Sequence, residues 1–375
     1  MIVIGVLWKM LLANKTMKLN QITFTRFIAA ISIVIFHYGK DVFPFNFSSL
    51  LSFFKQADIG VSYFFLLSGF IMIIAYSKEK EINVLHYYQK RLARIYPIYF
   101  LAIIATFVYF VFIDKYINWP SLFISLLLLQ AWLPGHATEL NAAAWTLVIE
   151  LFFYSIFPLL YNKIYQKVNY KKLILPIIAL WLVSQIFLNW FLYSKFYTGF
   201  PSNSHEFIFY FPLLHLNEFL LGNLAGLWFV KKLINKQKNY DFYILILTIL
   251  LYLAILYPFN LNYHNGLLAI IFVPLILLIS LTTGLIKKIF NHKSLIFLGD
   301  ISYGVYILQI PIFLFTRKIM SHFAINNNTL NFYIPLFVLL ILSGLSYHYL
   351  ETPLRKYISN LKLKRTRNNS NLEVL

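Results

Sequence analysis

The feature that most constrains this chain is a series of ten apolar stretches, each close to 20 residues long. About 20 apolar residues in a helix are needed to cross the roughly 30 Å hydrocarbon core of a bilayer. We therefore predict an all-α integral membrane protein with about ten transmembrane helices. The predicted spans are residues 24–43, 57–77, 97–113, 141–161, 173–194, 207–230, 241–258, 264–284, 294–316 and 329–350.

Composition supports this class of protein, since 60% of the residues are hydrophobic and only 12% are charged. A soluble domain of this size cannot bury so much apolar surface. One further apolar stretch, residues 119–133, is shorter and is bounded by Pro120 and by Pro134 and Gly135. We predict a re-entrant or interfacial helix there, because counting it as a span breaks the charge pattern.

Basic residues are concentrated in alternate loops. With ten spans, 25 of the 32 Lys and Arg residues lie on the side that also holds both chain ends. The positive-inside rule places that side in the cytoplasm, so we expect both termini to be cytoplasmic in a multi-pass protein of the cell (inner or plasma) membrane. The net charge of +19 sits in these short loops, which argues for the lipid bilayer as partner and against nucleic acid.

The predicted organisation is one transmembrane domain at 19–358, between a cytoplasmic N-terminal segment at 1–18 and a basic cytoplasmic tail at 359–375. No small-residue cleavage site follows the first apolar run, so we expect no removed signal peptide. Met17 is an alternative start. We expect no soluble second domain and no repeat of fixed period.

The first span carries two ionisable residues, Arg26 and His37, eleven positions apart. Eleven residues make about three helical turns, so both side chains point the same way, about 16 Å apart along the axis. An arginine at the centre of a membrane helix costs about 2.5–3.5 kcal/mol, which indicates a functional use. The alternative is that Arg26 extends to the membrane surface and His37 is a buried, satisfied polar residue.

Depth counted from the basic side places four polar side chains near the middle of the membrane: His37, Glu150, Glu218 and Gln309. Ionisable groups at this depth normally face a bundle interior or a water-filled cavity and pair with each other. We therefore expect His37 and Glu150 to meet. The alternative is a structural polar cluster that holds helices together.

The helix around Glu150 also places Thr146 and Tyr154 on the same face, four residues to either side. A desolvated Glu can act as a general base or can orient a nearby histidine and stabilise its charge. Glu150 is therefore a candidate catalytic residue beside His37.

Arg91 and Arg94 are expected in the cytoplasmic loop that leads into the third span. Spaced by three, they project from one side of a helical turn, and their guanidinium forks suit phosphate. Taken alone they also fit topology signals, but with Arg26 at the same level they predict a three-arginine anion site. Ser68 precedes Gly69, a small pair that is typical of close helix packing rather than of a nucleophile.

Metal and thiol chemistry are not expected. The chain has no Cys, which excludes disulfides, zinc–thiolate sites and thiol nucleophiles. No HExxH or similar ligand spacing occurs, and His205, His215 and His264 are scattered. We therefore predict no metal site.

Six motifs, in order from residue 19 to about 357, resemble those of the membrane acyltransferase-3 family. Any one motif is weak, but six in register over ten spans are a strong signal. They are the Arg26–His37 pair with ten residues between, Gly60–Phe70, Arg91–Pro97, Trp145–Glu150 with Tyr154 and Pro158, Gly299–Tyr306, and Glu351–Pro353.

The resemblance implies an enzyme that moves acyl groups, usually acetyl, from cytoplasmic acetyl-CoA or another acyl-CoA to a cell-surface or lipid-linked carbohydrate. It implies no tightly bound cofactor. It gives functional importance to the first-helix pair and to the loop arginines. Further candidates from the matching helices are Tyr154, Glu218, Ser302, Tyr303 and Gln309.

Two positions depart from the family pattern. Gln309 stands where the family often has His, and His215 precedes Glu218 where an Arg is often found. A titrating role at Gln309 is therefore not expected.

Our mechanistic hypothesis is that Arg26, Arg91 and Arg94 hold the CoA phosphates while neutral His37 deprotonates a sugar hydroxyl, oriented by Glu150. An acyl-histidine intermediate stays open.

The main alternative function is a polytopic transporter or flippase for a glycan or acyl intermediate. A third possibility is a structural subunit of a polysaccharide synthase. The sequence leaves open the carbohydrate, the acyl group and the oligomeric state.

Overall fold

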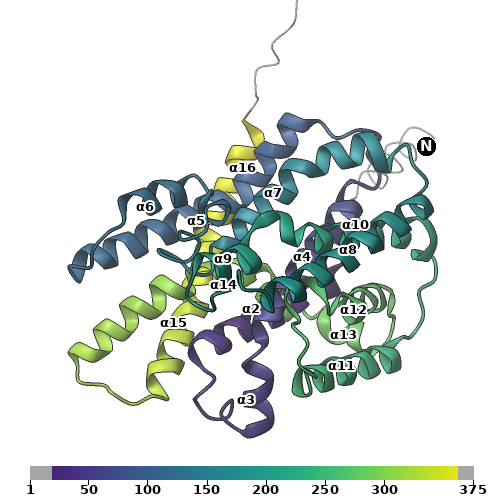
Figure 1. Cartoon of the computed structure of the whole chain (residues 1–375). Helices are drawn as coiled ribbons and strands as arrows, with labels where there is room; N and C mark the ends of the chain where they lie inside the picture. The colour runs from purple at the N-terminus through teal and green to yellow at the C-terminus, as the bar shows by residue number, and fades with distance from the viewer. Residues whose placement is uncertain (1–18, 362–375) are drawn as a thin grey trace, which may run out of the picture.

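The computed structural model describes residues 19–361, which form helices and no strand (Figure 1). The expected N-terminal segment 1–18 and the tail from residue 362 lie outside this range. Eight helical segments are long and apolar enough to cross a membrane, as expected for a multi-pass membrane protein. They are Asn20–Tyr38 (α2), Ala57–Tyr76 (which includes α4, Gly60–Tyr76), Val84–Phe112 (α5), Trp145–Tyr165 (which includes α7, Trp145–Leu159), Tyr170–Leu192 (α8), Asn203–Leu233, Lys293–His322 (α14) and Leu330–Asn360.

Two further apolar helices, α11 (Asp241–Leu256) and α12 (Ala269–Leu281), are shorter. Together with the eight longer segments, they overlap all ten predicted spans. The predicted short helix at 119–133 appears as α6 (Trp119–Leu126), followed by a single turn at Gln130–Trp132. Eight residues rise only about 12 Å, so α6 is far too short to cross a bilayer.

The third span differs from expectation, because the arginine motif is helical rather than a loop. The helix α5 begins at Val84, where the side chain of Asn83 accepts a hydrogen bond from the His86 N–H at 3.1 Å and caps the first turn. It then continues through Pro97 to Phe112. Arg91 and Arg94 therefore occupy fixed positions on a rigid helix, one turn apart.

The sixth span is interrupted. α9 (Asn203–Tyr210) ends before Pro212, a single turn covers Pro212–His215, and α10 (Leu216–Trp228) then begins. Proline has no N–H to donate and favours an extended residue before it, so Phe211 takes a β conformation and the helix breaks. Glu218 consequently lies in the first turn of α10 rather than in the middle of a long helix.

The helices α4 and α10 pack with their backbones in contact. A Cβ atom built on Gly222 would overlap the carbonyl oxygen of Leu66, and one built on Gly69 would overlap the carbonyl oxygen of Phe219. Small residues allow this close approach between membrane helices. The expectation that Ser68 and Gly69 mark a packing contact is confirmed for Gly69.

We expect Gly222→Ala to destabilise the protein by at least about 1–3 kcal/mol, because the added methyl group must push two backbones apart. The measurement is the thermal unfolding midpoint of the purified protein in detergent. Gly344→Ala is the matched control: its Cβ would lie 3.5 Å from Phe297, an ordinary contact. A Gly222→Ala midpoint equal to that of the control would contradict this packing.

Three basic segments meet at one end of the bundle: 78–94, 162–172 and 352–361. Asn162 Nδ2–H donates to the Ile82 carbonyl at 3.0 Å, and Gln89 Nε2–H donates to the Leu361 carbonyl at 2.8 Å. The helix α16 (Thr352–Asn360) lies beside the first turns of α5 (Figure 1). This arrangement agrees with the predicted placement of these three segments on a common side of the membrane.

The turn between α11 and α12 is hydrogen-bonded to the middle of α8. The Trp181 indole N–H donates to the Gly266 carbonyl at 2.8 Å, and Gln185 Nε2–H donates to the Asn265 carbonyl at 2.7 Å. Trp181 stands at the middle of α8, so this turn meets α8 at half its length. Gly266 adopts φ +94°, where a side chain is strained, and packs against Glu218.

Candidate functional site

Three arginines from two helices surround one cavity of about 130 Å³ toward the end of the bundle that carries the basic loops. Arg26 comes from the second turn of α2, and Arg91 and Arg94 come from α5. The other polar residues of the lining are Glu150 and Tyr154 of α7, Thr23 of α2 and Ser68 of α4. The predicted convergence of the three arginines is therefore present in the structure; we call this space the inner cavity.

Aromatic rings hold Arg91 in place. Its guanidinium carbon lies 5.6, 5.4 and 5.4 Å from the ring centroids of Tyr76, Tyr87 and Tyr154. Contacts at this distance are attractive, because the face of an aromatic ring is negative. Arg91 Nε is buried without a hydrogen-bond partner, so a donor of this guanidinium remains unused.

The inner cavity carries excess positive charge. Among residues 19–361, no carboxylate oxygen lies within 4.0 Å of Arg26, Arg91 or Arg94, since the ion pairs at that distance all involve histidine. Glu150 and Glu351 act on the arginines only at longer range. Cations that are partly desolvated and not ion-paired favour an anionic ligand.

A narrow middle cavity of about 40 Å³ continues from the inner one, and both are lined by Arg26, Arg94 and Glu150. Ser302 and Tyr303 of α14 face it. Both hydroxyls are already engaged: Ser302 donates to the Gly299 carbonyl at 2.7 Å, and Tyr303 donates to the Ile95 carbonyl. The sequence candidates Ser302 and Tyr303 thus belong to the site, as parts of its wall.

His37 lines a third, much larger cavity of about 730 Å³, which we call the outer cavity. It stands in the last turn of α2, and its side chain is exposed to this space. No hydrogen bond to the ring was found among the described residues. The imidazole is therefore free to accept a proton from a molecule in the cavity.

The walls of the outer cavity mix aromatic and polar groups. His264 donates from Nε2 to the Phe209 carbonyl at 3.0 Å and has its Nδ1 at 4.0 Å from Asp58 Oδ2. Glu206 fixes the segment that carries the lining residue Thr138, because its carboxylate accepts hydrogen bonds from the Gly135 and Ala137 N–H groups at 2.6 and 3.1 Å and from the Thr138 hydroxyl at 3.3 Å. The other lining residues with polar or aromatic side chains include Lys55, Gln56, Thr138, Trp145, Phe200, His205, Tyr210, Asn262 and Tyr263.

The three cavities lie in series. The inner and middle cavities share Arg26 and Glu150, and the middle and outer cavities share Val61 and Tyr306. Arg94 is also common to the inner and middle cavities, so the shared walls come from α2, α4, α5, α7 and α14. The result is a line of spaces through the bundle, with the three arginines at the inner end, His37 at the outer end, and Val61 and Tyr306 between the middle and outer cavities.

The expected contact between His37 and Glu150 is not formed. Glu150 Oε2 accepts a hydrogen bond from the Tyr154 hydroxyl at 3.1 Å and lines the inner and middle cavities, whereas His37 lines the outer one. The helix α2 ends at Tyr38, five residues before the predicted end of the span, where the Gly39 N–H donates to the Ile35 carbonyl at 2.8 Å. The depth counted from the predicted span therefore placed His37 too far inside the helix. His37 therefore lies at the outer end of its helix.

Glu218 and Gln309, the other two members of the expected polar layer, lie apart from all three cavities. Glu218 is fully buried, with Oε2 at 2.7 Å from His215 Nδ1. Gln309 is also buried and donates from Nε2 to the Tyr306 carbonyl at 2.7 Å. Neither lines the inner, middle or outer cavity, so the structure does not bring the four residues of the expected layer together around one space.

Sequence reasoning missed several residues of the site. Tyr76 and Tyr87 of the Arg91 cage gave no signal, because tyrosines are common in this chain. Tyr306 is the last residue of the Gly299–Tyr306 motif, in which only Ser302 and Tyr303 were predicted to belong to the site. Asp58 lines the outer cavity, and its signal in the sequence was an acidic side chain at the start of the predicted span 57–77.

No group of three or more His, Asp or Glu side chains within residues 19–361 has the arrangement of a metal site.

The sequence matches known proteins over most of its length. The model of the acyltransferase domain family (Acyl_transf_3) matches residues 19–348. The chain is 27% identical over 364 residues to the peptidoglycan O-acetyltransferase OatA of Listeria monocytogenes, covering 88% of this chain and 55% of that protein. It is 25% identical over 372 residues to the O-acetyltransferase OatA of Staphylococcus aureus, covering 88% and 56%.

A third relative is the acyltransferase MdmB of Streptomyces mycarofaciens, 28% identical over 234 residues, or 57% of this chain and 58% of that protein. The chain thus spans a little more than half the length of these three relatives. No solved structure matches it significantly. The match over residues 19–348 places the chain in the acyltransferase domain family, whose members are enzymes that transfer acyl groups.

Proposed function

We propose that this protein is a membrane-bound O-acyltransferase. It moves an acyl group, acetyl in the first instance, from cytoplasmic acyl-CoA to a hydroxyl of an extracytoplasmic or lipid-linked carbohydrate. Membership of the family supports the reaction class, and the names of the OatA relatives support an O-acetyl product on a glycan. The reaction needs no metal and no tightly bound cofactor.

The proposed topology has ten transmembrane helices in the cell membrane and both termini in the cytoplasm. The eight long helical segments and the shorter α11 and α12 supply the ten crossings. The positive-inside rule assigns the end that carries the basic loops to the cytoplasm. The inner cavity then opens toward the donor and the outer cavity toward the acceptor.

The donor is proposed to bind at the inner cavity. Guanidinium groups recognise phosphate with paired, charge-assisted hydrogen bonds, and Arg26, Arg91 and Arg94 offer such groups without a carboxylate within 4.0 Å. The CoA phosphates occupy this cationic space. The pantetheine arm extends through the middle cavity and carries the thioester toward the outer one.

His37 is the proposed general base. Its ring takes the proton of an acceptor hydroxyl while the oxygen attacks the thioester carbonyl. A carbon–oxygen bond forms, the carbon–sulfur bond breaks, and the CoA thiolate leaves and takes up a proton. Glu150 is assigned a different role from the one first expected: it balances the charge of Arg26 and Arg94 beside the donor path.

The outer cavity is the proposed acceptor site. Sugars present apolar ring faces and many hydroxyls, and this cavity offers both aromatic surfaces and hydrogen-bonding groups. Trp145, Phe200 and Tyr210 supply the former; Asp58 and Asn262 supply examples of the latter. A cavity of about 730 Å³ lies within the usual range for ligand sites.

The observation that carries the proposal is the line of three cavities, cationic at the end with the basic loops and holding a free histidine at the other. The test is a proteoliposome assay with acetyl-CoA labelled in the acetyl group on one side and cell-wall glycan on the other. We expect label in the glycan and an equal amount of free CoA on the donor side. Movement of intact acetyl-CoA or glycan without loss of the thioester would instead identify a transporter.

A further inference from the structure

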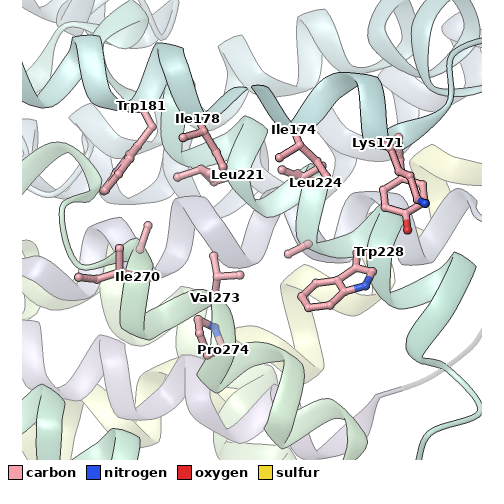
Figure 2. Close-up of a pocket in the computed structure, with 13 residues that line it drawn as sticks. Lys171, Ile174, Ile178, Trp181, Leu221, Leu224, Trp228, Ile270, Val273 and Pro274 are labelled. Carbon is pink, nitrogen blue, oxygen red and sulfur yellow. The ribbon is translucent and has the colours of Figure 1, made fainter. Parts of the chain in front are cut away.

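A second kind of space lies on the flank of the bundle, away from the line of cavities. Figure 2 shows a groove of about 540 Å³ between α8, α10 and α12. Its walls are apolar along most of their length. They include Ile174 and Trp181 of α8, Trp228 of α10 and Val273 of α12, with Tyr170 and Lys171 at one end.

The groove has a basic end. Lys171 lies at one extreme of the view in Figure 2 and Trp181 at the other. Lys231 Nζ lies 5.9 Å from the centroid of the Tyr170 ring, and Tyr170 lines this end of the groove, so a second ammonium group lies near the same end. The N-terminus of α8 is at the same end, and its helix dipole adds positive potential. No acidic residue lines the groove.

The lining ends at Trp181 on α8. The hydrogen bonds of Trp181 and Gln185 to the carbonyls of Gly266 and Asn265 tie the turn between α11 and α12 to α8 at this end of the groove. From Lys171 to Trp181 is ten residues, or about 15 Å of helix. That is half of the roughly 30 Å hydrocarbon core, the depth of one lipid leaflet.

The length of the groove, about 15 Å, distinguishes a bound lipid chain from a bound transmembrane helix. A transmembrane helix of a partner, or of a second copy of the chain, would follow α8 over its full length to Leu192. A phospholipid chain ends at the middle of the bilayer, where this groove ends. We propose that the groove binds one acyl chain of an anionic glycerophospholipid, whose phosphate lies between Lys171 and Lys231.

The test measures lipid retained by the full chain in detergent, by native mass spectrometry with added phosphatidylglycerol or phosphatidylcholine. One bound phosphatidylglycerol is expected, with weaker binding of phosphatidylcholine, whose headgroup has no net charge. Each lysine near a phosphate contributes about fivefold in affinity, so Lys171→Gln with Lys231→Gln weakens phosphatidylglycerol binding about 25-fold. Lys172→Gln with Lys232→Gln, the exposed neighbours, is the matched control.

A second pair of variants tests the apolar part. Ile174 lines the groove, whereas the adjacent Leu175 is 78% exposed and does not. We expect Ile174→Trp to fill the groove and abolish the bound lipid, and Leu175→Trp to leave it unchanged. Equal retention by these two variants, or equal loss in the two lysine pairs, would overturn the proposal. A dimer that Ile174→Trp dissociates would assign the groove to contact between copies of the chain instead.

Discussion

A His37→Ala variant is expected to lose at least about 100-fold in kcat for acyl transfer, with little change in the KM for acetyl-CoA. General base catalysis contributes about 10²- to 10⁴-fold, and His37 is the proposed base. It lies about 16 Å along α2 from Arg26, so removing its ring leaves the donor phosphates untouched. The measurement is incorporation of labelled acetyl into cell-wall glycan by the purified protein in proteoliposomes.

The control for His37 is His322→Ala, which removes an exposed histidine from the last turn of α14. It is expected to transfer at the normal rate. His37→Gln keeps a polar side chain but no base, and it should be as inactive as the alanine variant. Normal transfer by His37→Ala together with loss in His264→Ala would move the base to His264, which lines the same cavity.

Loss of the inner-cavity arginines should weaken binding of the acyl-CoA donor rather than slow the chemical step. We expect Arg94→Ala to lower kcat/KM for acetyl-CoA by about tenfold to 100-fold, mostly through KM, because a hydrogen bond to a charged group contributes about 1.5–3 kcal/mol. Arg91→Ala should have an effect of similar size. The measurement is initial-rate release of CoA over a range of acetyl-CoA concentrations.

Two further variants separate phosphate binding from a general effect of charge. Lys90→Ala removes an exposed cation from the same helix, next to Arg91, and should leave KM unchanged. Arg91→Lys keeps the charge but loses the planar fork, so KM should rise nearly as much as in Arg91→Ala. A fall in kcat without a change in KM for either arginine variant would place these residues outside the donor site.

The sequence predicts the helices of this protein well and their ends less well. Apolar length alone located the long apolar helices and the two shorter ones, α11 and α12, because the thickness of the bilayer sets the length of a helix that crosses it. It did not show that α5 starts at Val84, since the Asn83 cap and the packing on α16 extend that helix beyond its apolar part. Nor did it show that α2 stops at Tyr38, which depends on the turn at Gly39.

The sequence likewise predicts one part of the site, the three arginines, and not the rest. Arg91 and Arg94 share a face by helical spacing, and Arg26 joins them because its depth could be counted from the basic end. The pairing of His37 with Glu150 failed, because a depth count says nothing about which side of a partition a residue faces. The Tyr76 and Tyr87 cage could not be predicted, since it brings together helices that only the folded packing places side by side.

The glycine contact between α4 and α10 has a consequence for motion. Where backbones touch at Gly69 and Gly222, neither helix can slide or rotate without a steric clash, so the two form one rigid body. The partition between the middle and outer cavities includes Val61, which is fixed to this body, and Tyr306, which is not. Any widening of the passage at Tyr306 therefore requires α14 to move relative to α4 and α10, and α2 to move with it, because a Cβ on Gly299 of α14 would overlap the Thr23 carbonyl oxygen of α2.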